Sequence, residues 1–152
     1  MNDRIHVAVH LHPDDLDAAL RADVRDGLGR RPRSLPPKWF YDAVGSELFD
    51  RITRLPEYYP TEAERAALVD HADEIVDLAG CTTVVELGSG SSDKTRTLLD
   101  AATRTGRLER YVPIDVSAAA LEEGTAALAA AYPRLEVRGL VATYEAALAD
   151  DT

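Results

Sequence analysis

Val84-Val85-Glu86-Leu87-Gly88-Ser89-Gly90-Ser91-Ser92 is the stretch that decides the fold. An apolar run leads into two closely spaced glycines and then into a helical pattern, the order found where a buried strand turns into a helix. Glycine lets the backbone turn sharply and approach a ligand where a Cβ would intrude. Gly88 and Gly90 therefore predict a turn that can cradle a small molecule.

An acidic residue, Asp115, ends the next expected strand, where it is placed to accept both ribose hydroxyls of a nucleoside. Asp93 replaces the third glycine of a dinucleotide fingerprint and the second glycine of a P-loop, so neither motif is present. This pattern favours a nucleoside without a diphosphate, and S-adenosylmethionine (SAM) fits. Its methionine carboxylate would meet Lys94 and the opening of the following helix. The alternative is that the glycines only turn the chain and that Lys94 and Asp115 are solvated.

Around this motif, residues 61–152 alternate strand and helix patterns, which predicts an α/β fold with a parallel sheet and right-handed crossovers. We expect Thr61 and Ser117 to cap helices and Gly80 to end one. The expected strands are Thr82–Leu87, Tyr111–Asp115 and Leu135–Val141. The expected helices are Glu62–Ala79, Asp93–Thr103, Ser117–Ala131 and one that begins at Tyr144.

The sheet predicted in this way is unfinished. Its first strand, Thr82–Leu87, is normally central in such folds, but three strands leave one of its sides as an apolar edge. Two explanations stay open: the chain is a fragment of a longer protein, or another segment, for which Ile5–Leu11 is a candidate, fills that edge. We expect the isolated chain to self-associate or to be poorly soluble.

Residues 1–60 differ in composition from the rest. A helix is expected over Pro13–Leu28, with Gly29 as its cap. Residues 32–60 hold five of the eight prolines, the single Trp, both Phe and three of the six Tyr. Prolines between large rings predict an ordered, irregular segment that packs on something, either as a cover over the core or as the wall of a pocket.

Composition excludes several classes of protein. The 152 residues carry a net charge of -10, which disfavours nucleic acid and anionic membrane surfaces as partners. Cys81 is the single cysteine, so no internal disulfide forms, in agreement with a cytoplasmic location. The polar start is no signal peptide. The pair His10 and His12 is better explained by a polar face than by metal binding, and we predict no metal site.

Two long runs resemble the histidine Nα-methyltransferases of ergothioneine biosynthesis. They are Ser34-Leu35-Pro36-Pro37-Lys38-Trp39-Phe40-Tyr41-Asp42 and Ile52-Thr53-Arg54-Leu55-Pro56-Glu57-Tyr58-Tyr59-Pro60-Thr61. The segment Val84–Thr97 and the strand end Ile114-Asp115 are similar as well. The resemblance covers nearly all of this chain, which looks like the N-terminal half of the family enzyme.

The resemblance implies a Rossmann-like class I SAM methyltransferase core, of which 61–152 would be the first half, behind an N-terminal segment 1–60. It also implies transfer of three methyl groups from SAM to the α-amine of L-histidine, giving hercynine. By position, the cofactor side would use Tyr41, Gly88, Lys94 and Asp115.

Tyr58 would lie near the imidazole of the substrate, whereas Tyr59 could instead be the packing partner of that pair. The run that meets the adenine reads Ala142-Thr143-Tyr144, with Thr143 where the family has a carboxylate. A hydroxyl still accepts a hydrogen bond, but less strongly than an ionised group. The residues that grip the amino and carboxylate groups of histidine lie in the family's second half, so no catalytic residue is assigned here.

Two alternatives remain from the sequence. The chain is an inactive SAM-binding or nucleoside-binding fragment, or half of a split enzyme that needs a second chain. Otherwise it is a structural α/β domain whose edge strand is buried in an oligomer.

Overall fold

The computed structural model describes residues 4–40, 42–90 and 94–149. The chain forms two compact units: Met1–Leu11 with Arg65–Thr152, and His12–Glu64. The second boundary lies close to the expected division at residue 60. The first differs from expectation, because the N-terminal residues group with the sheet and not with the segment that follows them.

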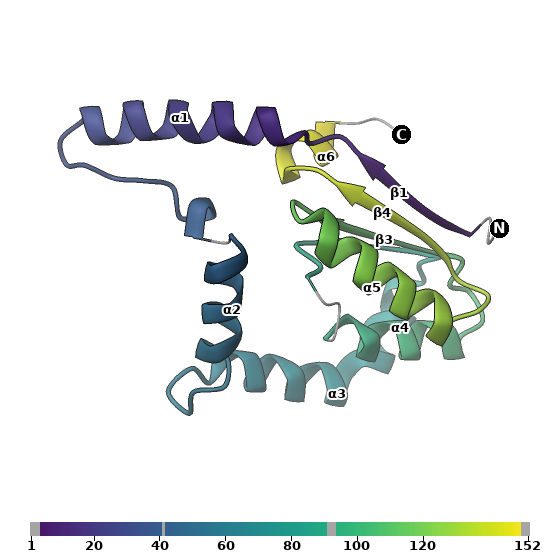
Figure 1. Cartoon of the computed structure of the whole chain (residues 1–152). Helices are drawn as coiled ribbons and strands as arrows, with labels where there is room; N and C mark the ends of the chain where they lie inside the picture. The colour runs from purple at the N-terminus through teal and green to yellow at the C-terminus, as the bar shows by residue number, and fades with distance from the viewer. Residues whose placement is uncertain (1–3, 41, 91–93, 150–152) are drawn as a thin grey trace. The chain divides into compact units, whose positions relative to one another are not determined.

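The first unit is built on a sheet of four parallel strands in the order β1-β4-β3-β2 (Figure 1). The predicted α/β fold with a parallel sheet is therefore confirmed, with one strand more than expected. The strands are β1 (Ile5–Val9), β2 (Thr83–Leu87), β3 (Arg110–Asp115) and β4 (Glu136–Val141).

The additional strand, β1, corrects one expectation. It pairs with β4, with Ile5 opposite Val137, and so lies at the edge of the sheet farthest from β2. The alternating run Ile5–Leu11 is long and apolar enough to form a strand, but its pattern carries no information about which edge it joins. The idea that this run fills the side of β2 is wrong, and β2 is an edge strand of the described sheet.

Four helices accompany these strands: α3 (Pro60–Ala79), α4 (Thr95–Arg104), α5 (Ala118–Ala131) and α6 (Tyr144–Ala149). The cap at Ser117 is confirmed, because its side chain accepts a hydrogen bond from the Ala120 N–H. Gly80, with φ +57°, follows the last residue of α3 as predicted. The cap at Thr61 is wrong, because α3 already begins at Pro60, a residue suited to a first helical turn.

One face of the sheet is covered by α4 and α5. Side chains from both helices meet those of β3 and β4 in a core that consists of Leu99, Tyr111, Leu128, Leu135 and Val137. The helix α5 lies so close to β4 that a Cβ on Gly139 would come within 3.3 Å of the Thr125 side chain. The part of α3 in this unit packs on α4 through small residues, Ala72 and Val76 against Ala101 and Ala102.

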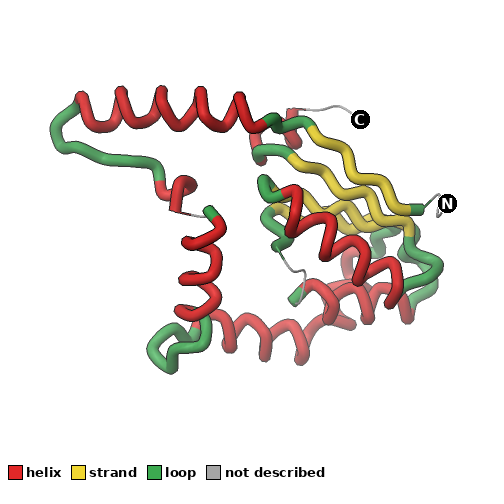
Figure 2. The backbone as a smooth tube through the Cα atoms, in the orientation of Figure 1, coloured by secondary structure: helices red, strands yellow, loops and turns green. Residues whose placement is uncertain are grey.

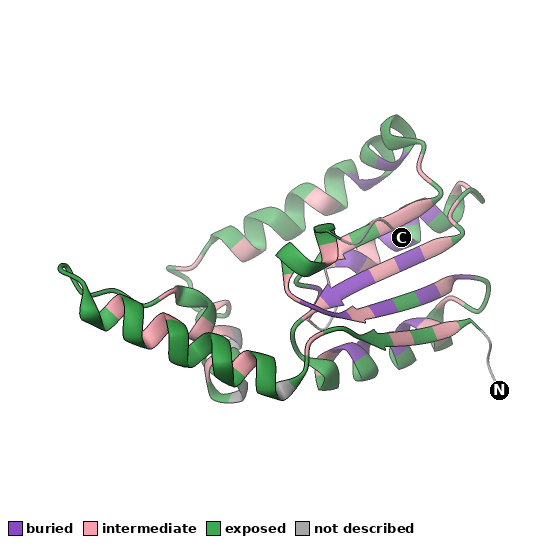
Figure 3. Ribbon diagram, turned by 90° about the horizontal axis from the view of Figure 1, so that it is seen from above, coloured by how far each residue is buried: buried purple, intermediate pink, exposed green. Residues whose placement is uncertain are grey.

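Among the described residues of this unit, the opposite face of the sheet is largely uncovered (Figure 3). The short helix α6 lies at the carboxyl end of the strands near β3, where Ile114 is buried. On β2, Val85 remains 58% exposed and Leu87 46% exposed. Parallel sheets are normally covered on both faces, so this half-covered sheet is unusual.

The second unit contains α1 (Pro13–Gly29), the 3-10 helix η1 (Pro37–Phe40) and α2 (Ala43–Ile52), as Figure 2 shows by colour. The helix expected at Pro13–Leu28 is confirmed, but Gly29 is its last residue and Arg30 is its cap. The expectation that 32–60 is irregular is wrong, because α2 occupies ten of these residues. Its start is fixed by Asp42, whose carboxylate accepts a hydrogen bond of 2.7 Å from the Gly45 N–H.

The proline-rich segment packs on α1, as predicted. The Trp39 indole N–H donates to the Asp23 carboxylate at 2.9 Å, and the Lys38 ammonium lies 2.9 Å from the same group. The hydrogen bonds from Lys38, which has the larger effect, and from Trp39 hold the pKa of Asp23 below its ordinary value. Near the end of α1, Gly27 lies under the Ser34 carbonyl, which would be only 2.0 Å from a Cβ at that position.

Candidate functional site

The glycine turn lies at the carboxyl end of β2 and is bonded to the neighbouring strand. Gly88 and Gly90 have φ of +71° and +48°, the left-handed region that favours glycine. The N–H groups of Gly88 and Ser89 both donate to the Ile114 carbonyl, at 2.8 and 3.2 Å. The predicted turn is thus confirmed, and β3 holds it in place.

Asp115 reaches this turn from the end of β3. One carboxylate oxygen accepts from the Gly90 N–H at 3.0 Å, and the other accepts from the Ser117 N–H at 2.9 Å. These bonds fix the carboxylate beside the turn, as the sequence predicts. Each oxygen of an ionised carboxylate has two lone pairs, so each retains an acceptor position for a ligand hydroxyl.

Tyr144, the first residue of α6, contacts the same turn. Its hydroxyl would lie 2.4 Å from a Cβ placed on Gly88, so the phenol lies directly against the glycine backbone. The side chain is still 47% exposed. Gly88 is therefore needed for its positive φ and also for this close approach. No local pattern in the sequence indicates a contact between residues so far apart.

Other predicted residues of the cofactor side are placed less directly. The Thr143 hydroxyl accepts from the Ala146 N–H at 3.2 Å and so caps α6. Lys94 directly precedes α4 and is half-buried. Tyr41 and the N–H groups of residues 91–93, which we expect to bind an anion, lie outside the described residues.

Glu86, on β2 just before the glycine turn, links three elements through hydrogen bonds. Its carboxylate accepts hydrogen bonds from the hydroxyls of Thr95, at the start of α4, and Tyr111, which is fully buried on β3. It therefore joins β2 to the neighbouring strand β3 and, across the glycine turn, to the start of α4. The sequence shows an acid at this position but does not identify its partners.

Ser89, between the two glycines, was missed as a candidate. Only 6% of the residue is exposed, and its hydroxyl oxygen has no hydrogen-bond partner within the described part of the chain. An unpaired buried hydroxyl costs about 1–3 kcal/mol, so such groups are rare unless a ligand or water completes them. The signal in the sequence is its place inside the Gly-Ser-Gly turn.

The substrate-side candidate, Tyr58, belongs to the second unit. Its ring packs edge-on against Phe49, with ring centres 6.1 Å apart and planes at 80°. Tyr59 is 72% exposed. Of the two tyrosines, Tyr58 therefore makes the packing contact in this unit.

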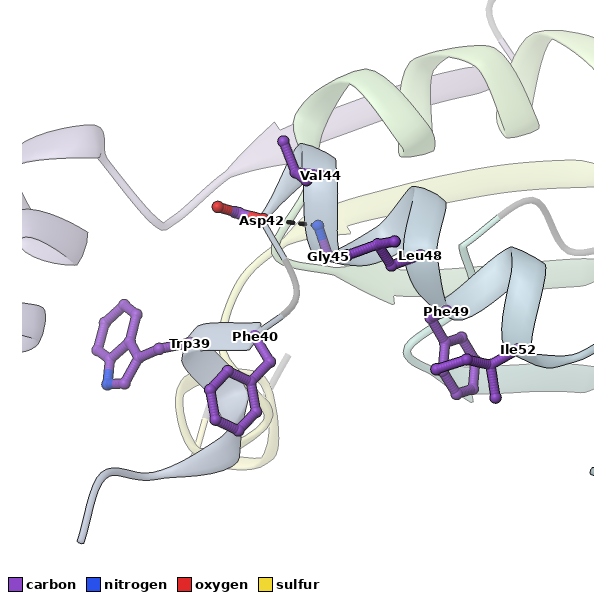
Figure 4. A pocket seen from close by; sticks show the side chains of 8 residues that line it. All are labelled: Trp39, Phe40, Asp42, Val44, Gly45, Leu48, Phe49 and Ile52. Atoms are coloured by element: carbon purple, nitrogen blue, oxygen red, sulfur yellow. Dashed lines mark hydrogen bonds between the residues drawn. The ribbon is translucent and has the colours of Figure 1, made fainter.

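The second unit also has an apolar hollow of about 500 Å³ (Figure 4). Its apolar side chains are open to solvent, with Phe40 66% exposed and Val44 65% exposed. Gly45 lets α2 start close to η1, because a Cβ there would overlap the Phe40 carbonyl. The lining residues are Trp39, Phe40, Asp42, Val44, Gly45, Leu48, Phe49 and Ile52.

Two kinds of feature are absent from the described residues. No group of three or more His, Cys, Asp or Glu residues in ranges 4–40, 42–90 and 94–149 is arranged to hold a metal ion. In the same ranges, no helix has the length and apolar character needed to cross a membrane.

Comparison with known proteins finds similar sequences over most of this chain. A family model described as histidine-specific methyltransferase, SAM-dependent, matches residues 20–152. The chain is 52% identical over 141 residues to the histidine N-alpha-methyltransferase of Mycolicibacterium smegmatis, and 51% identical over 142 residues to that of Mycobacterium tuberculosis. Each match covers 93% of this chain and 44% of the relative.

A more distant relative, ergothioneine biosynthesis protein 1 of Neurospora crassa, is 37% identical over 115 residues, which are 75% of this chain and 13% of that protein. The chain thus spans less than half the length of these curated relatives.

Proposed function

We propose, since this chain belongs to the family of histidine-specific, SAM-dependent methyltransferases, that the carboxyl ends of β2 and β3 bind SAM. The observation that carries the proposal is the hydrogen bond from the Gly90 N–H to the Asp115 carboxylate. It places an acceptor for sugar hydroxyls beside Gly90, where a Cβ would meet no described atom within 4 Å. The buried Ser89 hydroxyl, which has no hydrogen-bond partner among the described residues, fits the same interpretation.

The chain's own residues then have distinct roles. Asp115 accepts from the ribose hydroxyls, and Lys94 with the start of α4 attracts the methionine carboxylate. Tyr144 offers its ring to the adenine, and Thr143 offers a hydroxyl where the family has a carboxylate. SAM supplies an activated methyl group, so the protein needs to orient the acceptor amine and exclude water and does not need a nucleophile.

We further propose that the whole protein methylates the α-amine of L-histidine, with Tyr58 on the substrate side. This rests on the family and on the printed function of the two mycobacterial relatives. Because the chain spans less than half of them, we expect the 152 residues alone to bind SAM without turnover. The open edge at β2 favours this view of the chain as half of an active unit.

The first experiment is isothermal titration of the chain with S-adenosylhomocysteine, the demethylated product. We expect saturable binding, weakened about 10- to 100-fold by Asp115→Ala, because hydrogen bonds to a charged group contribute about 1.5–3 kcal/mol. The matched control is Asp73→Ala, which removes an exposed carboxylate paired with Arg104 on α4. Thermal unfolding of all three proteins checks that they are folded.

Absence of binding at millimolar ligand, or equal binding by Asp115→Ala and the parent chain, contradicts the proposed site and favours a purely structural domain. Mass spectrometry of histidine incubated with SAM and the chain tests turnover separately. We expect no change in histidine mass, and a gain of methyl groups would show that the 152 residues are sufficient.

A further inference from the structure

A hydrogen bond joins the two ends of the glycine turn. The hydroxyl of Thr95, the first residue of α4, donates to the carboxylate of Glu86, which lies on β2 just before the turn. Only 5% of Thr95 is exposed, so little water competes for this bond. The segment between the two residues contains Gly88, Gly90 and Lys94. The bond therefore fixes where α4 begins relative to the end of β2.

The N-cap residue of α4 does not supply the usual side-chain support. A typical N-cap is a Ser, Thr, Asp or Asn whose oxygen accepts from an N–H group of the first turn. Ser117 does this for α5. In α4 the N-cap is Lys94, which makes no side-chain cap hydrogen bond. The bond from Thr95 to Glu86 therefore takes the place of a cap in fixing the first turn of α4.

Glu86 makes a second hydrogen bond, which holds a different part of the structure. Its other carboxylate oxygen accepts from the hydroxyl of Tyr111, which is fully buried on β3. This bond connects two strands whose backbones are already paired from Thr83 to Leu87. The bond from Tyr111 therefore orients the carboxylate, whereas the bond from Thr95 holds α4 across the turn.

The position of α4 affects the two ends of the proposed ligand differently. The nucleoside end depends on Asp115, and the turn beside it is bonded to β3 through the N–H groups of Gly88 and Gly90. None of these bonds involves α4. The amino-acid end depends on Lys94 and the start of α4, which would attract the methionine carboxylate. A shift of α4 should therefore weaken binding of the amino-acid end alone.

We propose that Thr95 is a positioning residue for the amino-acid part of the bound ligand. It acts through Glu86, which holds the start of α4 at the spacing from the glycine turn that the methionine part spans. Thr95 itself needs no contact with the ligand. A segment that is already fixed loses less conformational entropy when a ligand binds, so the bond raises affinity by preorganisation. This inference rests on the proposed function, because it concerns the same site.

The test compares two ligands that share the same nucleoside. S-adenosylhomocysteine carries the amino-acid part, and methylthioadenosine lacks it. Amide NMR titration of the chain measures both affinities, including weak ones. Thr95→Val removes the hydroxyl and keeps the side-chain shape, and it should weaken binding of S-adenosylhomocysteine about five- to tenfold, the order of effect of one hydrogen bond. The affinity for methylthioadenosine should change by less than about twofold, because its contacts lie away from α4.

Further variants separate positioning from a general loss of structure. Thr95→Ser keeps the hydroxyl and should restore the affinity for S-adenosylhomocysteine. Tyr111→Phe removes the other donor to the same carboxylate. It should lower the midpoint of thermal unfolding, as Thr95→Val does, but it should change the affinity for S-adenosylhomocysteine by less than about twofold, because β2 and β3 stay paired. If Thr95→Val does not fold, Thr95→Ala loses the same hydroxyl and gives the same comparison.

The results distinguish the role of Thr95 from the proposed function itself. An unchanged affinity of Thr95→Val for S-adenosylhomocysteine, an equal weakening of both ligands, or the same loss in Thr95→Ser or Tyr111→Phe would each overturn the positioning role. Failure of the parent chain to bind S-adenosylhomocysteine would instead contradict the proposed function, and the positioning role with it.

Discussion

The two faces of the sheet have opposite surroundings although the same strands form both. On the covered face, Tyr111 and Val137 are fully buried under α4 and α5. On the opposite face, Val85 and Leu87 of β2 remain about half exposed. Hydrophobic stabilisation is roughly proportional to the apolar area removed from water, so the covered face must contribute most of the folding free energy of this unit.

The largest expected effect comes from a matched pair of leucines. Leu128→Ala empties a fully buried position of α5 and should lower the free energy of unfolding by about 2–5 kcal/mol, because it removes buried groups and leaves a cavity. Leu87→Ala, at a position 46% exposed, should cost less than about 1 kcal/mol. Urea denaturation followed by circular dichroism measures both. If both substitutions lower the free energy of unfolding equally, the face of the sheet that carries Leu87 is covered in solution.

A smaller effect is expected at the helix that covers the sheet. Ser117→Ala removes the side-chain acceptor for the Ala120 N–H and should destabilise the chain by about 1 kcal/mol. Ser117→Asp keeps an acceptor there, and its charge suits the positive end of α5, so it should retain most of the stability. If the two substitutions have the same effect in the same denaturation assay, the cap contributes nothing.

The smallest effect concerns the pH dependence of stability and the ion pairs of Glu136 on β4. The Arg110 guanidinium, and then that of Arg138, hold the pKa of Glu136 below its ordinary value. The stabilisation is therefore fully present above the ordinary carboxyl pKa and is lost as the pH falls through the lower, folded value. In Glu136→Gln, the midpoint of thermal unfolding should fall less between neutral and acidic pH. An unchanged slope would contradict the role of this ion pair.

Much of the first unit could be predicted because its signals are local. A strand followed by two glycines, a serine cap at Ser117 and an apolar helix pattern each occupy adjacent residues. The position of β1 could not be predicted, because alternation identifies a strand but not its neighbour. The helix α2 was missed because prolines dominate the composition around it, although aspartate, here Asp42, is a typical N-cap residue.

The same difference between local signals and contacts of distant residues applies to the candidate site. Asp115 and Gly90 were predicted together, because strand ends in a parallel sheet meet at one edge. The contact of Tyr144 with Gly88 and the ties from Glu86 to Tyr111 depend on side-chain packing between distant residues, which no spacing encodes. Roles for Tyr41, Lys94, Thr143 and Tyr58 stay predictions.

The most direct test of the proposed SAM site is a titration of the isotopically labelled chain with S-adenosylhomocysteine, followed by amide NMR. We predict that the largest shifts occur at Gly88, Ser89, Gly90 and the residues beside Asp115, with saturation at one ligand per chain. Shifts confined to α1 and α2, or none at saturating ligand, would contradict a nucleoside site at the carboxyl ends of β2 and β3.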